Sequence, residues 1–131
     1  MKVQNQKVLE GCAALTAIAI QERQTPWKFG GLARLAMARN LKRLSDAKDT
    51  IETTKQGLAK ELGLGAAPNR TLAEEPDQEA AGKFLAEWKT LMEAESEVVL
   101  TKIKVSDLRL DENQIPLAVL NGLDWLLTED A

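Results

Sequence analysis

The sequence has no histidine and no tyrosine, a single cysteine, and few aromatic residues, which make up 4% of its 131 positions. Without histidine there is no imidazole base, no histidine-bearing zinc site and none of the common triads that activate a nucleophile. One cysteine, Cys12, cannot form a disulfide within the chain, and low cysteine content favours a reducing compartment. These absences predict a protein that is not an enzyme, with no catalytic residues, no metal site and no cofactor.

Long apolar runs are also missing. The apolar stretch nearest the N-terminus, residues 13–20, is flanked by polar residues and lacks the basic region and cleavage site of a signal peptide. It is far shorter than the roughly 20 apolar residues that span a bilayer. We therefore expect a cytoplasmic protein with no membrane partner.

The length suits a single domain over residues 1–131, large enough to bury roughly two-thirds of its unfolded surface. Apolar periodicity and breakers predict its elements. These are strand 1–5, helix 6–21, long helix 26–62, loop 63–76, helix 77–95, strand 97–105 and helix 115–128. The predicted fold class is mainly α with a small β element: a helical hairpin or bundle of a long central helix with amphipathic helices, and one short two-stranded or intersubunit β element.

The long helix carries a seam of apolar residues with a seven-residue spacing. Met37, Leu44, Ile51 and Leu58 recur along it, a pattern that favours packing along another helix at a shallow angle. Thr25 is a suitable N-cap, and Pro26 a suitable first residue, for this helix. The alternative is that Gly30-Gly31 delays its start to about Leu32. Residues 77–95 have the cleanest amphipathic stripe and are expected to cover the seam.

The segment EVVLTKIKVSDL changes to the two-residue period of a half-buried strand with a lysine-bearing outer side. A lone strand leaves its main-chain hydrogen-bonding groups unpaired. Residues 1–5 are the obvious partner within the chain, and a second subunit is the alternative.

Charge is segregated along the chain, although the net charge is only −3. Seven basic residues and one acid lie between Arg23 and Lys48, against eight acids and two lysines between Glu74 and Glu97. The favoured interpretation is that the two segments are neighbours and neutralise each other. A basic surface for nucleic acid or for an acidic protein partner is the functional alternative.

Several residues are candidates for an interaction surface, with Trp27 expected as an exposed anchor beside the basic residues of the long helix and the lysines of the strand. The set is Trp27, Arg34, Arg39, Lys42, Arg43, Lys102 and Lys104. Other chemically suggestive residues have simpler explanations: Cys12 is expected to be a buried, inert thiol, and the clustered acids to serve turns and caps.

Two segments resemble a family of small, uncharacterised phage and prophage proteins. The matching letters are Pro26, Lys28, Arg39 to Leu44 (within A-R-N-L-K-R-L) and Lys102 to Leu108 (K-I-K-V-S-D-L). The chain departs from the family at Gly30-Gly31 and in the longer connection 63–76. The resemblance implies a phage-encoded protein, in the cytoplasm of a bacterial host or in the virion, and it brings no catalytic residues.

Together these features lead us to expect a non-enzymatic phage or prophage protein that acts in protein–protein interaction or virion assembly. We expect it to be a homo-oligomer or to bind a phage protein partner. The alternative is a nucleic-acid-binding or anti-defence regulator that uses the basic face of helix 26–62.

Overall fold

The computed structural model describes residues 2–64 and 78–128. The mainly α fold with a small β element is confirmed. The helices are α1 (Asn5–Glu22), α2 (Gly31–Glu61), α3 (Gln78–Glu93) and α4 (Leu117–Leu123). The strands are β1 (Lys2–Gln4), β2 (Glu95–Glu97), β3 (Ile103–Lys104) and β4 (Leu127–Thr128), and short 3-10 turns cover residues 105–108 and 124–126.

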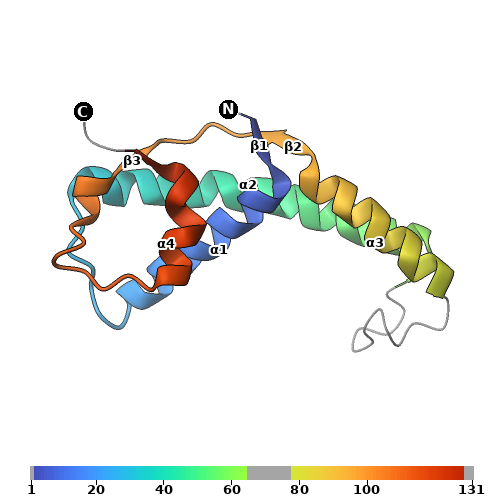
Figure 1. The fold of residues 1–131 in the computed structure, drawn as a ribbon, viewed down its shortest axis with the longest axis horizontal. Helices are drawn as coiled ribbons and strands as arrows, with labels where there is room; N and C mark the ends of the chain where they lie inside the picture. The colour runs from blue at the N-terminus through green and yellow to red at the C-terminus, as the bar shows by residue number, and fades with distance from the viewer. Residues whose placement is uncertain (1, 65–77, 129–131) are drawn as a thin grey trace.

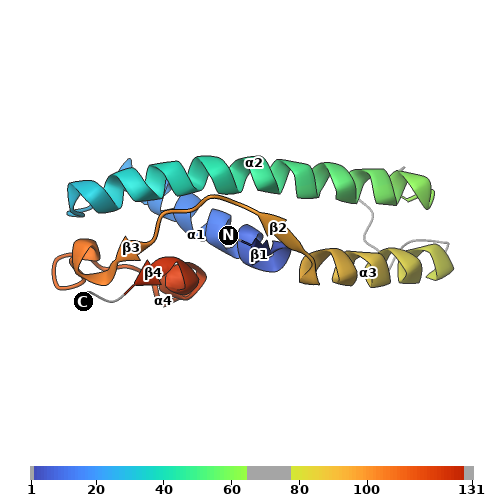
Figure 2. The same cartoon turned by 90° about the horizontal axis from the view of Figure 1, so that it is seen from above.

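Helix α2 forms one layer of the molecule and runs along most of its length (Figure 2). The second layer consists of α1 and the C-terminal elements under the first half of α2, and of α3 under its second half (Figures 1 and 2). The chain between β2 and β3 runs beside α2 and connects the two halves.

The seven-residue seam on α2 explains this division. Met37, Leu44 and Ile51 are buried in a core cluster shared with α1, α4 and the segment around β3. Leu58, further along the seam, packs in a second cluster around Phe84 of α3. The seam therefore holds two helices in succession, because α2 is longer than either of its partners.

The long helix begins at Gly31, so the prediction that it begins at residue 26 is wrong. Residues 26–30 have no regular structure, and within them Trp27 and Phe29 turn inward. Their conformation is held by side chains, since the Trp27 N–H donates to Glu22 and the Lys28 N–H donates to Asn113. These contacts replace the first helical turn that Thr25 and Pro26 would otherwise have started.

Most of the strand predicted over 97–105 is not a strand: only Glu97, the last residue of β2, and Ile103–Lys104, which form β3, are paired, and both strands pair within the chain. The first, β2, is antiparallel to β1 with Val3 opposite Ser96, as expected for residues 1–5 as the partner. The second, β3, is parallel to β4, with Ile103 opposite Leu127. Residues 98–102 between them belong to neither strand.

The last predicted helix, 115–128, is also too long. Helix α4 ends at Leu123, and a 3-10 turn leads into β4. Leu127 and Thr128 leave the helix because they provide the only partner that β3 has among the described residues. The predicted loop 63–76 is described only at its start, where Gly63 adopts a φ of 75° after α2, and residues 65–77 lie outside the described part.

Helix α4 lies close against α1 at Gly122. A β-carbon placed on Gly122 would lie 2.9 Å from the β-carbon of Ala14 and 3.2 Å from the main-chain oxygen of Glu10. Because the second neighbour is backbone of a buried helix, the space cannot be gained by a side-chain rotation. The absence of a side chain at Gly122 therefore sets the α1–α4 distance.

We predict that Gly122→Ala lowers the free energy of unfolding by about 1–3 kcal/mol, the usual range for overpacking. Gly57→Ala is the matched control, since a β-carbon added to Gly57 of helix α2 would meet no neighbouring atom within 4 Å. There alanine should stabilise the protein by roughly 0.5–1 kcal/mol through helix propensity. Urea unfolding of both variants tests this, and equal effects of the two substitutions would contradict the close packing.

Candidate interaction surface

The segment 98–102 is fixed to α2 by one buried side chain. Asn40 is fully buried on α2; its Nδ2 donates to the main-chain oxygen of Thr101, and its Oδ1 accepts from the Thr101 N–H, both at 2.8 Å. The amide thus bonds Thr101 as a neighbouring strand would. On the next turn of α2, Arg43 Nη1 donates to the main-chain oxygen of Val99 at 2.9 Å.

A groove of about 200 Å³ lies between α2 and this segment, and we call it the α2–β3 groove. Its walls combine exposed aliphatic residues of α2 with cations from both sides. The residues that characterise it are Leu32, Leu35, Arg39, Lys102, Lys104 and Asp107. Leu32 is 72% exposed and Leu35 46% exposed, and both stand on the α2 wall of this groove.

Three of the seven residues predicted for an interaction surface line this groove. Arg39 comes from α2, and Lys102 and Lys104 come from the opposite wall. Lys102 Nζ also donates to the main-chain oxygen of Trp125 at 2.5 Å, which ties this wall to the C-terminal elements. Arg43 stands beside the groove, where it holds Val99.

The other predicted residues lie elsewhere. Lys42 is exposed on α2 outside the groove. Arg34 is bound within the fold: its guanidinium pairs with Glu22 at 2.8 Å and donates to the main-chain oxygens of Trp27 and Phe29. Arg34 therefore holds the α1–α2 connection in place.

The prediction that Trp27 is an exposed anchor is wrong. Its side chain is only 8% exposed, and its Nε1 donates to the main-chain oxygen of Ile18 at 2.9 Å. Its ring stacks on Phe29, with centroids 5.2 Å apart. Tryptophan combines a large apolar surface with one donor, and at this position both are used to close the end of the core.

Among the described residues no ion pair joins the basic segment to the acidic one, although Arg43 and Glu97 line one hollow. The ion pairs of the described part are Lys7–Glu10, Arg34–Glu22 and Lys83–Glu79, and none joins α2 to α3. Helix α3 packs on the second half of α2, beyond the basic residues, where Lys55 lies over the Trp88 ring. Glu74, Glu75 and Asp77 lie outside the described part.

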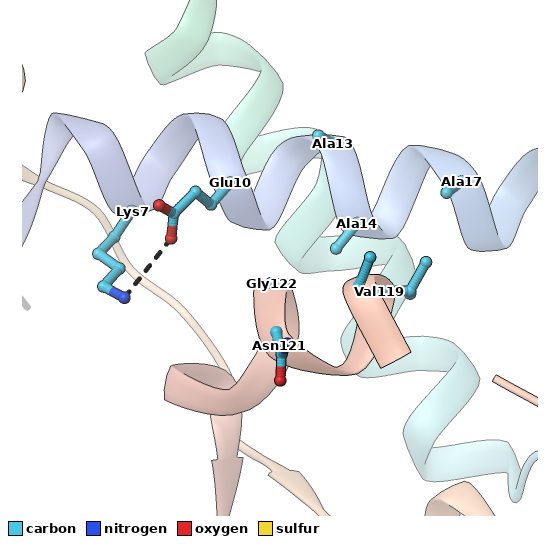
Figure 3. Close-up of a pocket in the computed structure, with 9 residues that line it drawn as sticks. Lys7, Glu10, Ala13, Ala14, Ala17, Val119, Asn121 and Gly122 are labelled. Carbon is cyan, nitrogen blue, oxygen red and sulfur yellow. Dashed lines mark ion pairs between the residues drawn. The ribbon is translucent and has the colours of Figure 1, made fainter. Parts of the chain in front are cut away.

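A larger and shallower hollow of about 520 Å³ lies between α1 and α4 (Figure 3). Alanines 13, 14 and 17 form much of its lining, and the Lys7–Glu10 ion pair at 3.5 Å lies at its rim. Few polar groups converge in it, so it offers little with which to orient a small substrate.

The remaining candidates for chemistry are structural. Cys12 is buried as expected, with its Sγ 3.7 Å from Ser45 Oγ. Within residues 2–64 and 78–128, no three acidic or thiol side chains are placed to hold a metal ion. None of the helices in this part of the chain has the length and hydropathy needed to cross a membrane.

Sequence reasoning missed the leucines of the groove and the role of Asn40. Asn40 stands three residues after Met37 and four before Leu44, on the buried stripe of α2. A polar side chain at such a position signals a specific buried partner, because asparagine is otherwise unfavourable inside a helix. That signal identifies the position but not Thr101, which is 61 residues away.

Comparison with protein-family models, curated protein sequences and solved structures finds no match to this chain.

We predict that Asn40→Ala lowers the free energy of unfolding by about 2–3 kcal/mol, because two hydrogen bonds at about 1 kcal/mol each are lost together with buried contacts. Amide exchange at Thr101 should become faster at the same time. Gln56→Ala, at an exposed position of α2, serves as the control and should change stability by less than about 0.5 kcal/mol. Equal stability of the two variants in urea would contradict the role of Asn40.

A second prediction concerns the ionisation of the Glu22 carboxyl. The hydrogen bond from Arg34, followed by that from the Trp27 N–H, holds the pKa of the Glu22 carboxyl below its ordinary value of 4.5. The stability from this carboxylate is therefore fully present above 4.5 and is lost as the pH falls through the lowered folded-state pKa. We expect Glu22→Gln to unfold more easily than wild type at neutral pH, and the difference to shrink in acid. Urea midpoints measured across this range test it, and a constant difference at every pH would count against the ion pair.

Proposed function

We propose that this chain is a non-enzymatic phage- or prophage-encoded protein that binds another protein through the α2–β3 groove. Its role would be that of an interaction or virion-assembly factor in the cytoplasm of a bacterial host or in the virion. The observation that supports this most strongly is the pair of exposed leucines, Leu32 and Leu35, beside the cations of the groove. Exposed apolar residues grouped within a polar rim are typical of surfaces that bind proteins.

The resemblance to phage proteins gives this surface additional weight. Its matching residues fall on Arg39 to Leu44 of α2 and on Lys102 to Leu108. These two stretches are distant in sequence but both reach the groove. The second supplies most of one wall and the first supplies Arg39, whereas the exposed leucines of the α2 wall lie outside the matching letters. The Asn40–Thr101 contact lies at the junction between them.

Self-association is the second part of the proposal. It does not rest on the strand, because β2 and β3 find their partners within the chain. It rests on apolar residues away from the groove, chiefly Leu117 at the start of α4, which is 73% exposed, and Ile20 near the end of α1. In a two-fold interface the same patch meets itself, so an uncharged surface is better suited to it than the basic groove.

Nucleic-acid binding is the alternative function. Arg39, Lys42 and Arg43 lie close together on α2, and such a cluster attracts phosphates. No aromatic residue lines the groove to stack a base, since Trp27 is turned into the core. The duplex DNA measurement in the next subsection separates this function from protein binding.

We predict that light scattering on the purified protein gives a mass above that of one copy, increasing with concentration. Leu117→Ser should shift the mass towards the monomer, because it removes an aliphatic group that is 73% exposed at the start of α4. Leu32→Ser removes an equally exposed leucine from the groove and should leave self-association unchanged. A strict monomer at all concentrations, alone and when co-expressed with the products of neighbouring phage genes, would contradict the proposed function.

A further inference from the structure

The α2–β3 groove has the size of a side-chain site. Its volume of about 200 Å³ lies below the ~300–1,000 Å³ range of small-molecule pockets. The exposed Leu32 and Leu35 stand on its α2 wall, and the buried Ile103 lies on the other. An aliphatic side chain from another protein would fill this space and cover the two leucines.

The cations around the groove have different roles. Lys102 and Arg43 hold main-chain oxygens of the fold. Arg39 and Lys104 are exposed, and neither takes part in an ion pair among residues 2–64 and 78–128. The nearest acid in the lining, Asp107, is half-buried and lies against Gly30. The groove therefore presents two exposed cations and one half-buried acid, and no ion pair joins them among the described residues.

Acidic residues further along α2 limit the position at which an acidic partner would bind favourably to the groove. A separate hollow between α2 and residues 97–99 is lined by Arg43 together with two acids, Asp46 and Glu97. A long polyanion following α2 would meet these carboxylates, whereas a short segment seated at Arg39 and Lys104 would not. Like charges in contact cost affinity, so the pattern favours a short acidic segment.

The walls are also held in place before binding. Asn40 bonds Thr101 on the opposite wall by two hydrogen bonds, and β3 is paired with β4. A groove fixed in this way loses little conformational freedom when it is occupied, and this raises the affinity that a small contact can reach.

We infer that the α2–β3 groove binds an acidic segment of a partner protein, which inserts one aliphatic side chain beside Leu32 and Leu35 and places carboxylates on Arg39 and Lys104. This inference rests on the proposed function and names the chemistry of the partner. A second copy of the chain is a poorer occupant in a two-fold arrangement, because the cations of the two grooves would face each other.

The test uses the full chain and fluorescently labelled probes in an anisotropy titration. The first probe is a glutamate-rich synthetic peptide with one central leucine; the others replace that leucine by serine, or the glutamates by lysine, or are duplex DNA. We expect the leucine-bearing acidic peptide to bind best. Replacing its leucine should weaken binding about tenfold or more, as expected for burial of one such side chain.

Variants of the groove complete the experiment. Arg39→Glu combined with Lys104→Glu should weaken binding of the acidic peptide about tenfold or more, and Leu35→Ser should reduce the effect of the peptide leucine. Lys48→Glu combined with Lys89→Glu makes the same change in net charge at exposed positions outside the groove, and should alter binding by less than about threefold. Circular dichroism shows that each variant is folded.

Several results would overturn the inference. Equal binding of the acidic and basic peptides, or no effect of the peptide leucine, would remove the basis for a specific site. Tighter binding of duplex DNA that is lost in the Arg39/Lys104 variant would assign the surface to nucleic acid. Self-association lost in that variant would assign the groove to a second copy. If no peptide binds but a complex with a phage protein is disrupted by Leu35→Ser, the proposed function stands and the acidic partner is wrong.

Discussion

The hydrogen bonds between Asn40 and Thr101 are the contact on which the rest of the structure depends. Residues 98–102 are extended but belong to neither short sheet, so their main-chain groups need other partners. A single amide on α2 supplies both a donor and an acceptor at 2.8 Å, and it does so from a fully buried position. The bond from Arg43 to Val99 and the burial of Val98 hold the part of the segment before Thr101. The two halves of the molecule are joined through α2, through this segment, and through the direct contacts of β1 with β2 and of α1 with α3.

Buried asparagine side chains also bond distant parts of the chain at two other places, close to the ends of helices and strands. Asn5 Nδ2 donates to the main-chain oxygen of Leu91, near the end of α3, and its Oδ1 accepts from Ser96 in β2. Asn113 Oδ1 accepts from the Lys28 N–H, while its Nδ2 donates to Leu108. These three asparagines are the buried polar residues of the described part, and no buried side-chain nitrogen or oxygen there lacks a partner. An amide can donate and accept at once, so one asparagine side chain can satisfy both a hydrogen-bond donor and a hydrogen-bond acceptor of the surrounding chain.

A feature of this fold could be predicted from the sequence when it is determined by residues that are close together in the chain. The seam of Met37, Leu44 and Ile51 and the stripe of α3 are periodic within one helix, so they were predictable, and the pairing of residues 1–5 with the strand followed from the need for a partner. The start of α2 and the burial of Trp27 depend instead on contacts with Ile18 and with Asn113, which is 85 residues from Lys28. The loss of a continuous strand over 97–105 depends on the bond of Asn40 to Thr101 and on the pairing of β3 with β4. Local propensity carries no information about such distant contacts. For the candidate surface, the cations were predictable as a basic cluster, whereas the assignment of Arg34 to the α1–α2 connection required the fold.

The charge pattern takes its meaning from the same long-range contacts. Arg34, Arg43 and Lys102 each hold main-chain oxygens, so two of the seven basic residues of the basic segment, and one lysine outside it, serve the fold. These cations keep their charge, but the fold holds each of them in one position, a distinction that the sequence does not show. Arg39 and Lys104 differ because, among the described residues, they make no ion pair and hold no main-chain oxygen, and they line the groove with the exposed leucines. Stability and recognition therefore share one structural element. A partner seated in the groove would bridge α2 and the β3 wall just as Asn40 does, so occupation of the groove should strengthen the contact that defines it.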